Sequence, residues 1–161
     1  MLNFKITGVI FIFLCGVYFS FDVKNKYDKR IKVLEGFLKD FEFFINEISF
    51  LKTPVNEIIL KLKKEVNNEF YDFLLSYNLV KVRERLLCCE YCLLSKDADI
   101  IYDFFKSLGT SDYENQINTL KAQKELLKGQ IKEAKGNKEK NQKSLTSLTM
   151  CSFIVIIIFL I

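Results

Sequence analysis

Hydrophobic and polar positions divide this chain into three parts. Residues 1–21 and 145–161 are almost purely apolar, while the stretch between them carries nearly all the charge. All 20 acidic residues fall between Asp22 and Glu139, and of the 24 basic residues only Lys5 lies outside 22–144. Apolar runs of about 17–25 residues can cross a bilayer as helices. We therefore predict a transmembrane helix at each end and a water-facing domain between them.

Each apolar end has an alternative explanation. Residues 1–21 resemble a cleaved signal peptide in placing Lys5 before the apolar run, but no small-x-small cleavage site follows that run. Residues 145–161 can be a buried core helix, but such a helix would show a polar face and this segment shows none. Two spanning helices remain the leading interpretation.

In the middle part, apolar residues recur every three or four positions, which predicts helices. The stripe of the first helix consists of Ile31, Leu34, Phe37, Leu38, Phe41, Phe44, Ile45 and Ile48. Thr53 can cap a second helix, and Pro54 suits its first position because no N–H donor is needed there. Shorter stripes predict helices over 55–62, 70–77, 82–93 and 100–108, and heptad-like spacing predicts a last one over 113–134.

The predicted fold class is therefore all-α. It is a bundle of about five to six helices over residues 22–134, held between N- and C-terminal transmembrane helices. Residues 135–144 are polar on every side and form either a linker or a solvated helix.

A sharp turn is predicted between the last two helices of the domain. Gly109 can adopt the left-handed conformation that ends a helix. Ser111 and Glu114 have the spacing of a capping box, and Asp112 adds a negative charge favourable to the helix dipole. We expect a tight structural corner at Gly109, Ser111, Asp112 and Glu114.

The composition offers no signature of catalysis. Histidine is absent and the six glycines are isolated, so the commonest general base and any phosphate-binding glycine loop are missing. The one tempting arrangement is Cys89-x-x-Cys92, next to Cys88. A zinc or redox site needs a second cysteine pair, a histidine or a strand-to-helix setting, and the sequence offers none of these. Packing of the cysteines in the core is therefore the preferred interpretation. We expect no enzyme activity, cofactor or metal.

Charge predicts the orientation and the partners. Residues 22–32 carry a net +3 and residues 121–144 a net +5, whereas residues 33–120 carry a net −5. Basic residues beside transmembrane helices favour the cytoplasmic side and can bind anionic lipid. The acidic body repels phosphates, so we expect no nucleic-acid partner. Glu90, Asp97, Asp99 and Asp103 form a candidate acidic face for a protein partner, with an ordinary solvated helix face as the alternative.

Several short motifs carry a resemblance that covers nearly the whole chain. They are Glu47-Ile48 followed by Thr53-Pro54, Lys96-Asp97-Ala98-Asp99-Ile100-Ile101, and Leu108-Gly109-Thr110-Ser111-Asp112 with Gln116. In this order, between two apolar ends, they resemble the stage III sporulation protein AB family of endospore-forming bacteria.

The resemblance implies a function. It implies a non-enzymatic component of the complex built across the envelope between mother cell and forespore, with its domain in the mother-cell cytosol. The implied fold is similar to the cytoplasmic domains of the type II secretion inner-membrane platform protein. The implied partners are a stage III sporulation protein AA-like ATPase and other membrane components of the same complex. A membrane-anchored scaffold or signalling bundle unrelated to secretion is the alternative, and a redox or metal enzyme using Cys89 and Cys92 is a third hypothesis.

Overall fold

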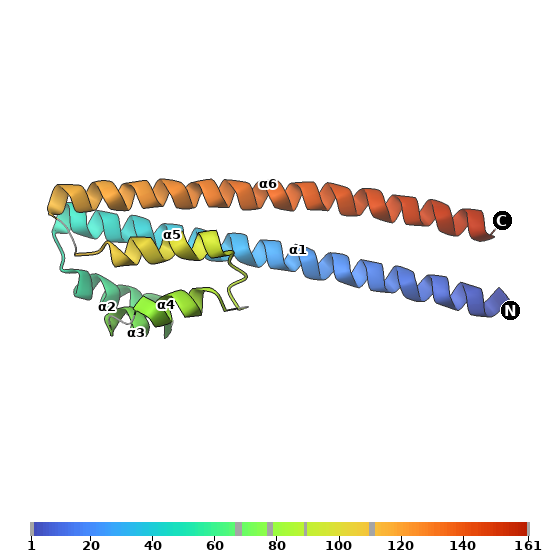
Figure 1. The fold of residues 1–161 in the computed structure, drawn as a ribbon, viewed down its shortest axis with the longest axis horizontal. Coiled ribbons are helices and arrows are strands. Elements are labelled where there is room, and N and C mark those ends of the chain that lie inside the picture. Colours follow the sequence, from blue (N-terminus) through green and yellow to red (C-terminus); the bar gives the residue numbers. More distant parts are fainter. Residues whose placement is uncertain (1, 67–68, 77–78, 89, 110–111, 161) are drawn as a thin grey trace. The chain divides into compact units, whose positions relative to one another are not determined.

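The computed structural model describes residues 2–66, 69–76, 79–88, 90–109 and 112–160, although most side chains of the two apolar ends lie outside this description. Within these ranges every regular element is a helix, which confirms the all-α prediction. The elements are α1 (Leu2–Asn46), the π-helix η1 (Glu47–Leu51), α2 (Val55–Val66), α3 (Glu69–Leu75), α4 (Leu79–Leu86), α5 (Ser95–Lys106) and α6 (Tyr113–Leu160) (Figure 1).

The chain divides into two compact units, which we describe separately. The terminal unit consists of Met1–Asp28 and Ala134–Ile161, and the bundle unit of Lys29–Glu133. Among the residues that the structure describes, we find no helix both apolar and long enough to cross a membrane. Most side chains of the predicted spans 1–21 and 145–161 lie outside those residues, so both spans stay predictions.

The two terminal helices are longer than the elements that periodicity alone marks out. The segment 135–144 is helical throughout and belongs to α6, so the solvated-helix alternative describes it and the linker does not. Lysine, glutamate and glutamine are good helix formers, which lets the helix continue where no apolar stripe supports it. Gly136 lies inside this segment of α6, and nothing packs within 4 Å of the position that a Cβ would occupy there.

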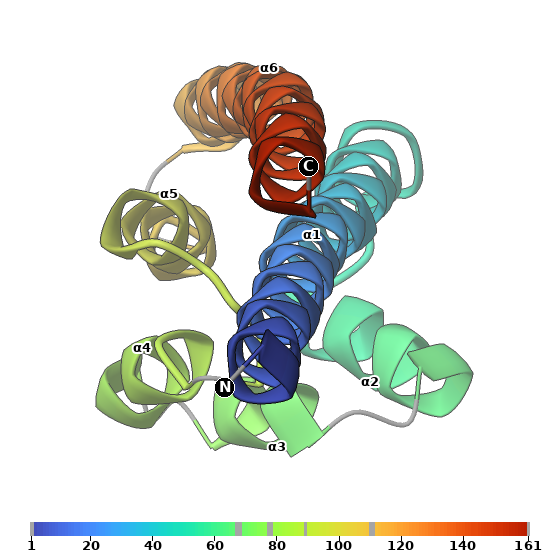
Figure 2. The same ribbon diagram turned by 90° about the vertical axis from the view of Figure 1, so that its right-hand side faces the viewer.

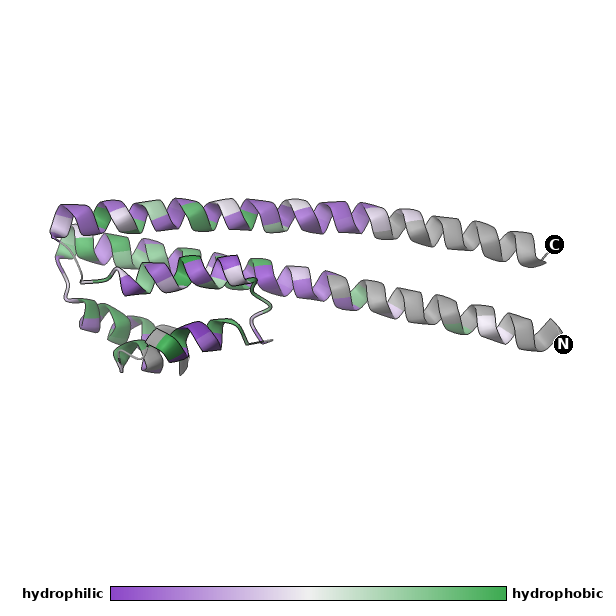
Figure 3. Cartoon of the chain, in the orientation of Figure 1, coloured by the Kyte–Doolittle hydropathy of each residue, from purple (hydrophilic) through white to green (hydrophobic). Residues whose placement is uncertain are grey.

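Within the bundle unit, α1 lies between α6 on one side and α2 and α3 on the other, with α5 beside it (Figures 1 and 2). Apolar and polar residues both occur along the part of α1 that belongs to this unit (Figure 3). The buried apolar residues of α1 and η1 are Ile31, Leu34, Phe37, Phe41, Phe44, Ile45 and Ile48. These are the predicted stripe except for Leu38, which is half-buried. The other helices contribute buried residues such as Ile58, Phe70, Val82, Ile101 and Leu127.

A group of phenylalanines joins α1 to α5 at the centre of the core. The rings of Phe41 and Phe104 stack with their centroids 3.5 Å apart. Phe44 contacts Phe104 edge-on at 5.9 Å, and Phe105 contacts Phe70 of α3 at 5.4 Å. The edge-on contacts are of the kind that aromatic pairs favour. Phe104 and Phe105 are neighbours in sequence and both are buried, so more than one face of α5 is covered.

The junction between α1 and α2 differs from its prediction by one residue. The carbonyl of Pro54 accepts the first hydrogen bonds of α2, from the backbone of Glu57 (2.9 Å) and Ile58 (3.2 Å). Pro54 therefore occupies the cap position rather than the first helical position. The prediction of Thr53 as the cap was wrong, since its hydroxyl donates to the Glu47 carboxylate at 2.7 Å.

Candidate functional site

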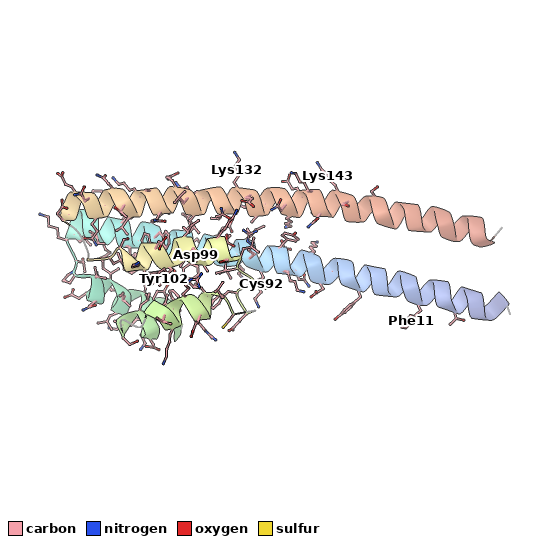
Figure 4. The ribbon with its side chains drawn as sticks, viewed as in Figure 1. Phe11, Cys92, Asp99, Tyr102, Lys132 and Lys143 are labelled. Atoms are coloured by element: carbon pink, nitrogen blue, oxygen red, sulfur yellow. The ribbon has the colours of Figure 1, made fainter. Side chains whose placement is uncertain are left out.

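The four carboxylates of the predicted acidic face do not share one environment. Asp97 is fully buried, so it cannot present its charge to a partner. Asp99 accepts from Arg83 at 2.9 Å, and Glu90 pairs with Arg85 at 3.1 Å. Asp103 is exposed on the same helix as Asp99, which is labelled in Figure 4. The prediction of one acidic face through Asp97 is therefore corrected: one carboxylate belongs to the core and two are locally neutralised.

Asp97 instead forms a buried link between α1 and α5. Its carboxylate accepts from Arg30 Nε at 2.7 Å and from Arg30 Nη2 at 2.9 Å. It also accepts from the backbone N–H of Leu94 at 2.9 Å, which satisfies one of the free donors at the start of α5. Two parallel bonds from a guanidinium fix both position and direction. This pair sets where the first turn of α5 lies against α1.

Sequence reasoning missed Arg30, although a signal was present. Arg30 lies one helical turn before Leu34 and two turns before Phe37, on the stripe that faces the core. A basic residue on a core-facing stripe predicts a buried acid as its partner. We had counted Arg30 among the basic residues flanking the membrane instead.

Glu47 forms a second link, at the end of α1. Its carboxylate accepts from Thr53 Oγ1 at 2.7 Å and from Lys61 Nζ of α2 at 2.8 Å. The hydrogen bond from Lys61, with that from Thr53, lowers the pKa of Glu47 below its usual value. These bonds close the turn from η1 into α2. They also give a physical reason for the spacing of Glu47 and Thr53 in the family-like motif.

The predicted corner between α5 and α6 is present, with a shifted cap. Gly109 has φ +74°, the left-handed conformation expected of a helix-ending glycine. Ser111 lies outside the described residues. The Asp112 carbonyl accepts from the Gln116 N–H at 2.9 Å, which places Asp112 at the cap position of α6. Its carboxylate accepts from Asn115 Nδ2 at 2.7 Å, and Glu114 is exposed in the first turn.

Replacing Gly109 with valine is expected to destabilise the bundle unit by about 1–2 kcal/mol or more, because a β-branched side chain is strained at positive φ. Gly129→Ala is the matched control, because Gly129 is helical and nothing lies within 4 Å of an added Cβ. The control should be stabilised by up to about 1 kcal/mol. Thermal unfolding of both variants measures the difference. A Gly109→Val protein as stable as the parent would show that the corner tolerates another backbone conformation.

The terminal unit contains the parts of the basic flanks up to Asp28 and from Ala134 onward. Lys138 pairs with Asp28 at 2.5 Å, and Asn141 donates to the Tyr27 hydroxyl at 2.6 Å. These contacts join the end of Met1–Asp28 to α6 within this unit. Lys143 projects away from the helix axis (Figure 4). Such exposed lysines next to apolar segments have the chemistry to contact anionic head groups.

The cysteines lie in the turn that connects α4 to α5. Cys88 is exposed and Cys92 half-buried, and neither forms a disulfide, while Cys89 lies outside the described residues. Core packing therefore does not account for Cys88. Cys92 has φ +54°, an unusual value for a residue other than glycine. Across the part of the chain that the structure describes, no three potential ligands of the His, Cys, Asp or Glu type come together to hold a metal ion.

Two large apolar side chains at one end of the bundle unit remain exposed. Phe50 is 82% exposed and Leu51 66% exposed, at the end of η1. Tyr113, the first residue of α6, is 42% exposed and donates its hydroxyl to the Ser49 carbonyl at 2.6 Å. We call Phe50, Leu51 and Tyr113 the apolar tip. Periodicity does not predict it, because heptad-like spacing over 113–134 counts Tyr113 among the core-facing positions.

Comparisons with known proteins agree with the motifs. The family model described as stage III sporulation protein AB matches residues 5–84 and 82–161, which together span almost the whole chain. No curated protein matches significantly. No solved structure does so either. On the strength of the family match, this chain belongs to the stage III sporulation protein AB family.

Proposed function

We propose that this chain is a non-enzymatic membrane platform of the complex between mother cell and forespore, and that its bundle unit docks a cytosolic secretion-type ATPase. Family membership assigns the chain a role in sporulation, and this observation carries the proposal. The apolar ends and the charge pattern of the sequence support the membrane part of it.

The organisation of the bundle unit supports a docking role. A rigid core, held by the Phe41–Phe104 stack and the Arg30–Asp97 pair, can present a fixed surface to a partner. The buried carboxylates of Asp97 and Glu47 accept hydrogen bonds from Arg30 and Lys61, so they stabilise the fold of the bundle unit. The predicted membrane spans are parts of α1 and α6, the same helices that enter the bundle unit. In the proposed cell-membrane location, the basic flanks contact anionic lipid.

The proposed orientation predicts that Cys88 is shielded in intact cells. Cys88 is exposed on the bundle unit, so it serves as a native reporter. A membrane-impermeant maleimide should leave it unmodified in intact cells and label it after permeabilisation, if the bundle unit faces the cytosol. An engineered Asn25→Cys variant, in the exposed basic flank, should behave in the same way. Labelling of either thiol from outside the cell would reverse the orientation.

The docking proposal predicts direct binding of the ATPase. The full-length chain, purified in mild detergent, should bind a purified stage III sporulation protein AA-like ATPase from the same organism saturably, and binding should weaken with salt if charges contribute. The chain alone should show no ATP hydrolysis. A chain that stays folded but shows no binding to the ATPase would reject docking and favour the alternative, a membrane-anchored scaffold or signalling bundle.

A further inference from the structure

We propose that the apolar tip is the surface of the bundle unit that binds a cytosolic protein partner, and that this partner presents an apolar centre flanked by basic side chains. The inference deepens the proposed function, on which it rests, because it names the surface to which the ATPase would bind. It differs from the predicted acidic face on α5, from which Asp97 is withdrawn by burial and in which Asp99 and Glu90 are paired with arginines.

The exposure of the tip is the first observation. Phe50 and Leu51 are neighbours in sequence and are 82% and 66% exposed, so two large apolar side chains stand in water side by side along the backbone. Burying an apolar side chain of this size is worth about 1.5–3 kcal/mol. In the described part of the bundle unit no contact buries these two side chains, whereas a partner surface can bury them. Aromatic side chains at the centre of an interface often carry most of its binding energy.

The tip is also held in place. The Tyr113 hydroxyl bonds to the Ser49 carbonyl at 2.6 Å, which attaches the start of α6 to η1. On the other side, Glu47 is bonded to Thr53 and Lys61. A surface ordered before binding loses less conformational entropy when the partner arrives. Phe50 and Leu51 therefore project from a segment that hydrogen bonds hold on both sides.

Charge identifies the kind of partner. Three exposed acids lie in or beside the first turns of the two helices that begin at this end, namely Glu57 of α2 and Asp112 and Glu114 flanking Tyr113. Lys52 is the neighbouring base in the connecting turn. Acids around an apolar centre complement a partner with basic residues around its own apolar centre.

The same charges argue against two other occupants. Anionic lipid head groups would be repelled by Glu57, Asp112 and Glu114. A second copy of this chain, docked tip to tip about a two-fold axis, would bring those acids against their own equivalents. The tip lies at the end of the bundle unit where η1 ends and α6 begins (Figure 1).

The test compares three variants of the full-length chain in mild detergent, each titrated with the purified ATPase. Phe50→Ser with Leu51→Ser should weaken binding about tenfold or more. Leu126→Ser is the matched control, because Leu126 is 54% exposed on α6 and lies more than three turns from Tyr113; its affinity should be unchanged. Asp99→Lys with Asp103→Lys tests the α5 surface and should also leave affinity unchanged. Circular dichroism melts verify that each variant is folded.

A fourth variant, a double charge reversal, tests the charge argument. Glu57→Lys with Glu114→Lys should weaken binding at low salt and reduce its dependence on salt. If the unaltered chain binds the ATPase but the Phe50→Ser, Leu51→Ser variant binds equally well, the tip proposal is rejected and the proposed function stands. If the unaltered chain does not bind the ATPase at all, the proposed function itself fails. Loss of a self-associated dimer, or of binding to anionic vesicles, in the tip variant would also overturn the proposal by revealing a different occupant.

Discussion

Replacing Asp97 with alanine is expected to destabilise the bundle unit by about 3–5 kcal/mol, because the variant leaves a buried guanidinium without its counter-charge. The Arg30 side chain is only 5% exposed, so water cannot replace the lost carboxylate. The backbone N–H of Leu94 loses its acceptor as well. Urea denaturation of the full-length chain in mild detergent, followed by circular dichroism, measures the change in free energy of unfolding.

Two further variants test whether the destabilisation comes from breaking the Arg30–Asp97 pair or from removing any carboxylate of α5. Asp103→Ala removes an exposed acid from the same helix and should change stability by no more than about 0.5 kcal/mol. Arg30→Met combined with Asp97→Leu replaces both charges with apolar side chains and should recover most of the loss. An Asp97→Ala protein within about 1 kcal/mol of the parent would mean that Arg30 reaches water or another acceptor, and the link would not fix the position of α5.

Replacing Phe104 with alanine is expected to cost a similar amount, about 3–5 kcal/mol, through lost burial and the cavity left behind. Phe104 is fully buried, stacks on Phe41 with 3.5 Å between centroids, and meets Phe44 and Phe105 edge-on. Three rings would therefore lose a contact at once. The same denaturation experiment measures the effect.

Phe50→Ala is the matched control for the aromatic core. It removes the same group from a side chain that is 82% exposed, and its stability should stay within about 0.5 kcal/mol of the parent. The contrast separates the two roles assigned to phenylalanine in this chain: Phe104 stabilises the fold, while Phe50 is assigned to binding. Equal destabilisation by both substitutions would show that Phe50 packs against the protein after all.

The motifs that carry the family resemblance have structural explanations in this chain. Glu47 and Thr53 are joined by a hydrogen bond across the turn into α2. Asp97 is the buried partner of Arg30. Gly109 supplies the left-handed residue at the corner before α6. These positions serve the architecture, so a search for functional residues is better directed at exposed side chains that the fold does not use.

The sequence predicted the elements well, because their signals are local. Apolar residues three and four positions apart define the buried face of α1, and glycine at 109 marks the corner, without any knowledge of distant contacts. Boundaries were less accurate, as the cap at Pro54 shows, since neighbouring residues compete for the same backbone donors. The candidate partner face failed for a different reason. Asp97 and Asp99 look alike in sequence, and only the distance to Arg30 decides which of them is buried.

By itself, the sequence determined the fold class, the stripe of α1 and the segregation of charge from two apolar ends. Each of these follows from periodicity or composition, which a single stretch of chain contains. Tertiary structure decided the pairing of Arg30 with Asp97, the bond from Thr53 to Glu47, and the exposure of Phe50 beside Tyr113. Arg30 and Asp97 are 67 residues apart in the chain, and no local pattern encodes their meeting. Their proximity arises because helices bury their apolar faces against one another, and that packing selects which polar groups lose water and must find partners.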